Sequence, residues 1–215
     1  MAITINGTGS ITGLTAGGLP DGSVTAADIE TSLDLTGKTV TLPSGTGGQV
    51  LQVQYNSTSS VGQLAHSADT DTPHSYLSVD ITPVSQTSII YVSYHLFGEW
   101  SSSQHYIGGA LLSRRVGGTH NYLKAPTAGS RRSVVTASGL ISYQAGIDTT
   151  RSPETILFTQ YPDDHNQTTS TTITYFPATN LFGTDTWYYN RTVNDVDNNY
   201  HHRGISWIMA MEVAS

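Results

Sequence analysis

The stretch Ser-Ile-Ile-Tyr-Val-Ser-Tyr-His-Leu-Phe, residues 88–97, decides the fold. Its even-numbered positions from 90 to 96 are all apolar, and the odd-numbered positions add Ile89, Tyr91 and Phe97. Successive side chains of a β-strand point to opposite faces. A segment that is apolar on both faces and rich in β-branched and aromatic residues is typical of a strand buried on both sides. Residues 88–97 are therefore predicted to form a central strand.

The segments around this strand alternate with a period of two. Leu51, Val53 and Tyr55 alternate with glutamines, and residues 205–213 place a row of large apolar side chains on one face: Ile205, Trp207, Met209, Met211 and Val213. Further strands are expected at residues 77–81, 106–112, 134–143, 155–161, 171–176 and 187–193. No crossover helices separate them, so residues 46–215 are predicted to form an antiparallel, jelly-roll-like β-sandwich. We expect the face with Trp207, Met209 and Met211 to pack in its core.

Residues 1–45 differ in composition from the rest of the chain. Residues 1–20 carry no charge and are dense in Gly and Thr, and residues 17–22 give a strong turn signal. A short helix is expected from Thr25, which would cap it, and a short strand at residues 38–42. So small a segment buries little core alone. It is predicted either to need a partner surface or to fold back as an arm on its own domain.

Charge argues against nucleic acid as a partner. Nine basic and sixteen acidic side chains give a formal net charge of -7. A duplex-binding protein needs a basic stripe that neutralises phosphates. The only basic doublets are Arg114-Arg115 and Arg131-Arg132.

Cysteine content and hydropathy limit the kinds of site and the cellular location that the sequence predicts. The absence of cysteine excludes disulfides and thiolate metal sites. No run approaches the ~18 apolar residues that span a bilayer. Met1 to Ile5 lacks the basic region and long apolar core of a signal peptide. We expect no membrane partner and a protein made and assembled in a cytoplasm.

Metal-binding patterns are weak. The best histidine clusters are His201-His202 and Asp163-Asp164-His165, and neither has the spacing of a known metal motif. Asp195, Asp197 and Asn199 resemble only the start of a calcium loop. Polar loop residues are the favoured interpretation, so no metal ligand and no cofactor are predicted.

Catalytic patterns are also weak. No nucleophile elbow occurs. Glu99, Asp148, Glu154 and Asp185 are possible members of a carboxylate pair for glycoside hydrolysis, but most carboxylates sit beside turns. We predict no catalytic residues, and a polysaccharide depolymerase is the least favoured function.

Several aromatic residues lie in polar surroundings: Trp100, Trp187, Tyr188, Tyr189 and Tyr200. They could stack on sugar rings, but packing in the core or at a subunit interface is favoured. Trp100, Tyr188, Tyr189 and Tyr200 are therefore candidate trimer-interface or surface aromatics, and the three tyrosines are expected to approach a neighbouring subunit.

Two regions carry a resemblance to a known group of proteins. Residues 11–29 read ITGLTAGGLPDGSVTAADI, and the C-terminal half contains LFTQYPDD, TTSTTITYF and YYNRTVNDVDNNYHHRGISWIMAMEVA, starting at residues 157, 168 and 188. In these stretches the chain resembles virion structural proteins of tailed bacteriophages, the tail-fibre or head-fibre-like proteins of marine and other aquatic phages. Residues 99–132 depart from that pattern, being longer and richer in Arg and His.

The resemblance implies a fold and a virion context rather than a reaction. It implies a homotrimeric, non-enzymatic tail fibre or appendage, with outer loops that contact a host-surface glycan or receptor. Residues 1–45 would anchor the subunit to other virion proteins of the tail, portal or capsid, through Ile11, Leu14, Leu19 and Pro20. The alternative is a capsid decoration or head-fibre protein, which the lack of a long fibre shaft keeps open.

Overall fold

The computed structural model describes residues 48–101, 108–127, 129–137, 154–199 and 201–215, together with β1 (Thr4–Ile5) and β2 (Ile11–Thr12). The chain divides into two units, Met1–Pro43 and Ser44–Ser215. In the first unit β1 and β2 pair antiparallel, with Ile5 opposite Ile11. The predicted helix from Thr25, the predicted strand at 38–42 and the anchoring candidates Leu14, Leu19 and Pro20 lie outside the described residues.

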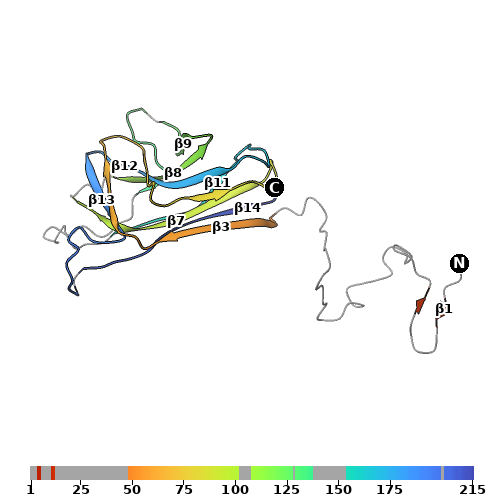
Figure 1. The fold of residues 1–215 in the computed structure, drawn as a ribbon. Helices are drawn as coiled ribbons and strands as arrows, with labels where there is room; N and C mark the ends of the chain where they lie inside the picture. Colours follow the sequence, from red (N-terminus) through yellow and green to blue (C-terminus); the bar gives the residue numbers. More distant parts are fainter. Residues whose placement is uncertain are drawn as a thin grey trace. The chain divides into compact units, whose positions relative to one another are not determined.

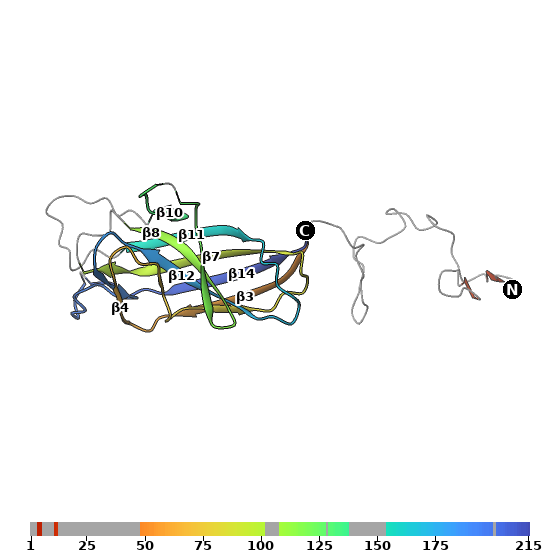
Figure 2. The same cartoon turned by 90° about the horizontal axis from the view of Figure 1, so that it is seen from above.

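The second unit is a sandwich of two six-stranded antiparallel sheets (Figures 1 and 2). The first sheet contains β3 (Val50–Thr58), β4 (Gly62–His66), β7 (Ile89–Trp100), β11 (Glu154–Asp163), β13 (Asp185–Tyr189) and β14 (Ser206–Val213). The second contains β5 (Thr72–Pro73), β6 (Val79–Ile81), β8 (Gly109–Val116), β9 (Thr119–Leu123), β10 (Thr136–Ala137) and β12 (Ile173–Asn180). This confirms the predicted β-sandwich. In the described part of the chain, no helix is long and apolar enough to cross a membrane.

Strand β7 is the central strand that residues 88–97 predict. It pairs with β14 on one side and β11 on the other, and its last residues pair with β13. Its even-numbered residues 90–96 point into the sandwich and are completely buried. Tyr94 stacks on Phe158 of β11 at 4.5 Å, and its hydroxyl donates a hydrogen bond to the carbonyl of Leu111 on β8. β7 therefore joins the two sheets as well as the strands of its own sheet.

Strand β14 faces the opposite way from the prediction. Ser206, Ile208, Ala210 and Glu212 are buried, whereas Trp207, Met209, Met211 and Val213 lie half-buried on the outer face. The expectation that Trp207, Met209 and Met211 pack in the domain core is therefore wrong. On the inner side, Ile208 and Ala210 pack in the hydrophobic core, and Ser206 and Glu212 are held by hydrogen bonds.

The chain enters and leaves the sandwich at the same end. The amide of Gly48 donates a hydrogen bond to the carbonyl of Ala214, and the amide of Ala214 donates to the carbonyl of Gln49. We call this the base end. The connection from β13 to β14 lies at the other end of β14, away from the C-terminus (Figures 1 and 2). At ~3.3 Å per residue, the eight residues of β14 hold these two features roughly 25 Å apart.

Candidate functional site

The connection between β13 and β14, residues 190–205, is a long polar loop that we call the far loop. Asn190 fixes its base. Its side-chain amide donates hydrogen bonds to the carbonyls of Thr58 and Ser60 at 2.9 and 2.8 Å, and its side-chain carbonyl accepts one from the hydroxyl of Ser206. Asn190 has a φ of 58°, a conformation that Asn tolerates better than most residues. One buried side chain thus ties together the ends of β3, β13 and β14.

Beyond Asn190 the loop forms a short stem. Arg191 and Arg203 form a β-bridge, and the amide of Thr192 donates to the carbonyl of His202. The amide of Val193 donates a hydrogen bond to the Glu99 carboxylate at 2.7 Å. Glu99 lies on the outer side of β7 by strand alternation, yet it is only 2% exposed. The far loop therefore folds over the outer face of the first sheet at that end.

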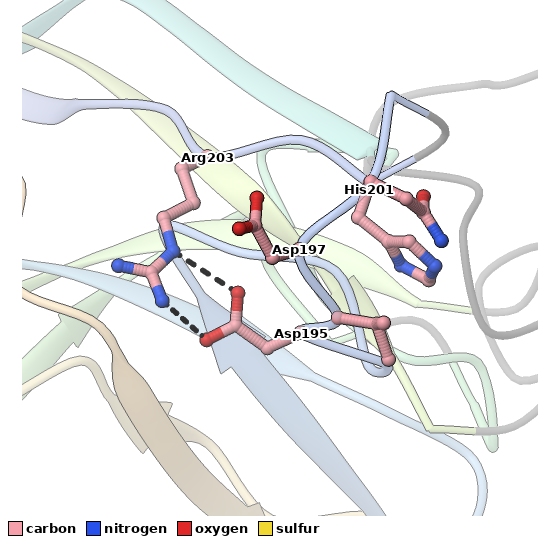
Figure 3. Close-up of a pocket in the computed structure, with 6 residues that line it drawn as sticks. Asp195, Asp197, His201 and Arg203 are labelled. Atoms are coloured by element: carbon pink, nitrogen blue, oxygen red, sulfur yellow. Dashed lines mark hydrogen bonds and ion pairs between the residues drawn. The ribbon is translucent and has the colours of Figure 1, made fainter.

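The tip of the far loop forms a pocket of about 310 Å³ (Figure 3). Its lining residues are Asp195, Val196, Asp197, Asn198, His201 and Arg203. The Arg203 guanidinium donates two hydrogen bonds to the Asp195 carboxylate, at 3.0 and 2.7 Å. The hydrogen bond from Arg203 lowers the pKa of Asp195. This pair holds the pocket wall in place and occupies the Asp195 oxygens.

The pocket offers carboxylate, amide, imidazole and guanidinium groups within one small volume. Such a set can donate to and accept from neighbouring hydroxyl groups of a polar ligand. Asp195 and Asp197, considered in the sequence as the start of a calcium loop, both line it, but Asp195 is paired with Arg203. Within the described ranges, no three His, Asp or Glu side chains are arranged so that they could hold a metal ion.

The aromatic residues that the sequence marked as candidates lie in different environments. Trp100 is 1% exposed and packs against Trp187 at 4.9 Å, so the prediction that it is a surface or interface aromatic is wrong. Tyr189 stacks on Tyr76 of its own domain at 3.8 Å. Tyr188 is half-buried, with the Arg191 guanidinium over its ring. Tyr200 lies outside the described residues, and the approach of the tyrosines to a neighbour stays a prediction.

Three of the carboxylates considered for catalysis do come together. Glu99, Glu154 and Asp185 are each 5% exposed or less. Burial, together with the smaller effect of the charges of Glu99 and Asp185, raises the pKa of Glu154 to about 8. Asp185 accepts hydrogen bonds from the Ser101 hydroxyl and the Thr186 amide. The cluster is enclosed in this structure and none of its members lines the far-loop pocket. Asp148 lies outside the described residues.

Two buried histidines accompany this cluster, and no sequence motif marks them. His74 is fully buried, and its ring nitrogens lie 2.9 Å from the Thr179 hydroxyl and 3.2 Å from the Tyr76 hydroxyl. His66 packs edge-on against Trp100 at 4.8 Å. Burial lowers the pKa of His66 to about 4, although Asp185 opposes this effect. Burial also lowers the pKa of His74.

These histidines should make the stability depend on pH. The pKa of His66 is 6.5 in the unfolded chain and about 4 in the folded chain. As pH falls from 6.5 to 4, protons bind His66 in the unfolded chain but not in the folded chain, so the free energy of unfolding decreases. The full difference is about 3 kcal/mol. The stability gap between wild type and His66→Gln should therefore narrow by about 2–3 kcal/mol between pH 7.5 and pH 4.5, measured by urea unfolding. A constant gap would contradict this assignment, and Glu154, present in both proteins, cancels in the comparison.

The outer face of the first sheet is the second candidate site. Its side chains come from four adjacent strands: Val53 and Tyr55 of β3, Trp207, Met209, Met211 and Val213 of β14, Ile89, Tyr91 and His95 of β7, and Leu157 of β11. Val53, Tyr55 and Leu157 are 50%, 59% and 55% exposed. The alternation of residues 205–213 marks this face in the sequence, but periodicity does not tell which face of a strand points inward.

The fold and these sites define an antiparallel β-sandwich protein with a polar pocket at one end and an uncharged apolar face along one sheet. Searches with protein-family models and against curated protein sequences gave no match.

Proposed function

We propose that this chain is a non-enzymatic structural protein of a virus particle, a homotrimeric tail fibre or appendage of a tailed bacteriophage. The observation that carries the proposal is that the chain enters the β-sandwich at one end and the polar pocket lies at the opposite end. The segment that would anchor it joins at the base end, through Gly48, and the far-loop pocket lies roughly 25 Å away at the other end of β14. A subunit fixed to a particle by residues 1–45 would present the pocket away from its attachment point.

The chemistry of the pocket supports a glycan as the ligand at the outer end. Sugars present pairs of hydroxyl groups that both donate and accept hydrogen bonds. The exposed carboxylate of Asp197, the Asn198 amide and the Arg203 guanidinium supply matching acceptors and donors. Val196 adds the apolar surface on which a sugar C–H face can rest. This arrangement supports the proposal of host attachment through a surface polysaccharide.

Loss of Asp197 should weaken attachment. A hydrogen bond to a charged group contributes about 1.5–3 kcal/mol, so Asp197→Ala should reduce the affinity of the full chain for host cells by about tenfold or more. The measurement is a titration of fluorescently labelled protein onto host cells. Asp80→Ala is the matched control, because it removes the same charge from an exposed position on β6. Equal binding by both variants would remove the pocket from host attachment.

A density map of the intact particle tests the proposal as a whole. Density for the chain on the tail or baseplate, with the base end inward and the far loop outward, is the expected result. Density on the capsid lattice would instead support the second candidate function, a decoration or head-fibre protein. A compact domain without a long shaft suits that role. Particles without the chain would overturn both.

A further inference from the structure

The outer face of the first sheet lies uncovered in the described chain. It carries mainly aromatic, Met, Val, Ile and Leu side chains, with Ser57 and Thr155 at its margins. Its one acidic side chain, Glu99, is buried under the far loop. Trp207, on β14 near the far loop, stacks against Tyr55 and His95, with ring centroids 6.4 and 6.1 Å apart. An antiparallel sheet with one face in the core normally turns polar side chains to water on the other. This sheet turns an apolar face to water instead.

The face has the size of a subunit contact. Four strands spaced ~4.8 Å apart and about 25 Å long cover on the order of 500 Å². Monomeric proteins rarely leave a contiguous apolar patch larger than a few hundred Å² exposed. A standard protein interface buries roughly 800 Å² on each partner, with an apolar centre and a polar rim. The outer face matches the centre of such an interface.

We infer that the outer face binds a second copy of this chain. The charge distribution favours a second copy as the partner of this face. The chain has a net charge of -7, so two copies repel each other over most of their surfaces and can approach closely where ionised side chains are lacking. Homo-oligomer contacts are enriched in aromatic residues and Met and depleted in Lys, Glu and Asp, which is the composition found here.

The other possible occupant in the same chain is a poorer match. Residues 1–47 contain no Phe, Trp or Tyr, and their apolar side chains are spread among Gly, Thr and Ser. The far loop closes one end of the face, where it covers Glu99, and does not extend over Trp207 or Met211. The inference rests on the homotrimer of the proposed function and places its subunit contact on β3, β14, β7 and β11 rather than at Tyr188 and Tyr189.

The experiment compares two double variants of the full chain that carry the same added charge. Val53→Lys with Leu157→Lys changes two side chains at opposite margins of the outer face, each at least half exposed in the single chain. Val84→Lys with Phe182→Lys changes two equally exposed apolar side chains elsewhere, 58% and 60% exposed. Light scattering gives the mass, and far-UV circular dichroism checks that each variant is folded.

Wild type and the control variant are expected to have a mass that is a multiple of 23.0 kDa, namely three times this mass for a trimer. The variant with Val53→Lys and Leu157→Lys is expected to have the mass of one copy.

Acrylamide quenching of tryptophan fluorescence supplies a second readout. Trp100 and Trp187 are buried in the single chain, and of the three tryptophans only Trp207 lies on the outer face. Quenching should rise in the outer-face variant alone. Monomeric wild type, or an oligomer that survives Val53→Lys with Leu157→Lys, would overturn the inference. A monomer whose Trp207 is shielded would overturn it too and would show that another segment of the same chain covers the face. None of these results depends on where the chain sits in a particle, which the density map decides.

Discussion

Trp187→Ala should lower the free energy of unfolding by about 3–5 kcal/mol. Trp187 is fully buried, packs against Trp100, and donates a hydrogen bond from its indole nitrogen to the Tyr76 hydroxyl at 3.1 Å. Its ring also fills the space beside Gly98, where an added Cβ would lie 2.4 Å from it. Alanine would leave a cavity in the core beside Gly98 and Trp100 and remove one of the hydrogen-bond partners of Tyr76.

Urea unfolding at one protein concentration measures this effect, since an oligomer's stability depends on concentration. Phe182→Ala is the control: Phe182 is 60% exposed and contacts Arg132 across its ring, so its loss should cost less than about 1 kcal/mol. If Trp187→Ala does not fold, Trp187→Phe should show a smaller loss of the same sign. Equal effects at 187 and 182 would contradict the described core.

Glu212→Ala should cost about 3–5 kcal/mol, although it removes a charge from the interior. The Glu212 carboxylate is fully buried at the base end and accepts hydrogen bonds from the amides of Val84 and Ser85 and from the side chains of Gln52 and Ser88. Alanine removes the acceptor of the Val84 and Ser85 amides, and each unsatisfied buried group costs about 1–3 kcal/mol. Gln52 and Ser88 keep second acceptors, the carbonyls of Thr82 and Ser85.

The protonation of Glu212 gives a second check. Burial raises the pKa of Glu212, but the hydrogen bonds from Ser88, Gln52, Val84 and Ser85 outweigh burial and lower it below its usual value. Its stabilising contribution is therefore present above about pH 4.5 and is lost as pH falls through the folded-state pKa. The difference between wild type and Glu212→Ala should shrink in acid. Asp164→Ala, which removes an exposed carboxylate, should change stability little at any pH. A pH-independent difference for Glu212→Ala would show that the carboxylate is not held ionised.

Parts of the sandwich could be read from local patterns, and others could not. The long strands at 89–100, 154–163 and 206–213 fall where alternation predicts them. Three strands were missed, at 62–66, 72–73 and 119–123. They are short, and 72–73 includes a proline, so their state is set by pairing with β13, β12 and β8 rather than by their own residues.

The candidate sites needed the tertiary structure for the same reason. The sequence marked Asp195, Asp197 and His201 as polar loop residues but did not single out Arg203. The pairing of Asp195 with Arg203 depends on the stem that Asn190 begins. His66 and His74 are far from Thr179 in the chain and meet only in the core. Nothing local distinguishes a buried histidine from a surface one.

By itself the sequence determined the class of fold, because the alternation of apolar and polar side chains along each strand is a local property that specifies an antiparallel β protein. The tertiary structure alone decided which side of β14 is buried. A period of two defines two faces without ranking them. In the folded chain Ile208 and Ala210 pack in the core with the large side chains of β7 and β11, and hydrogen bonds hold Ser206 and Glu212 inside. Trp207, Met209 and Met211 are therefore directed outward, onto the face where we place the subunit contact.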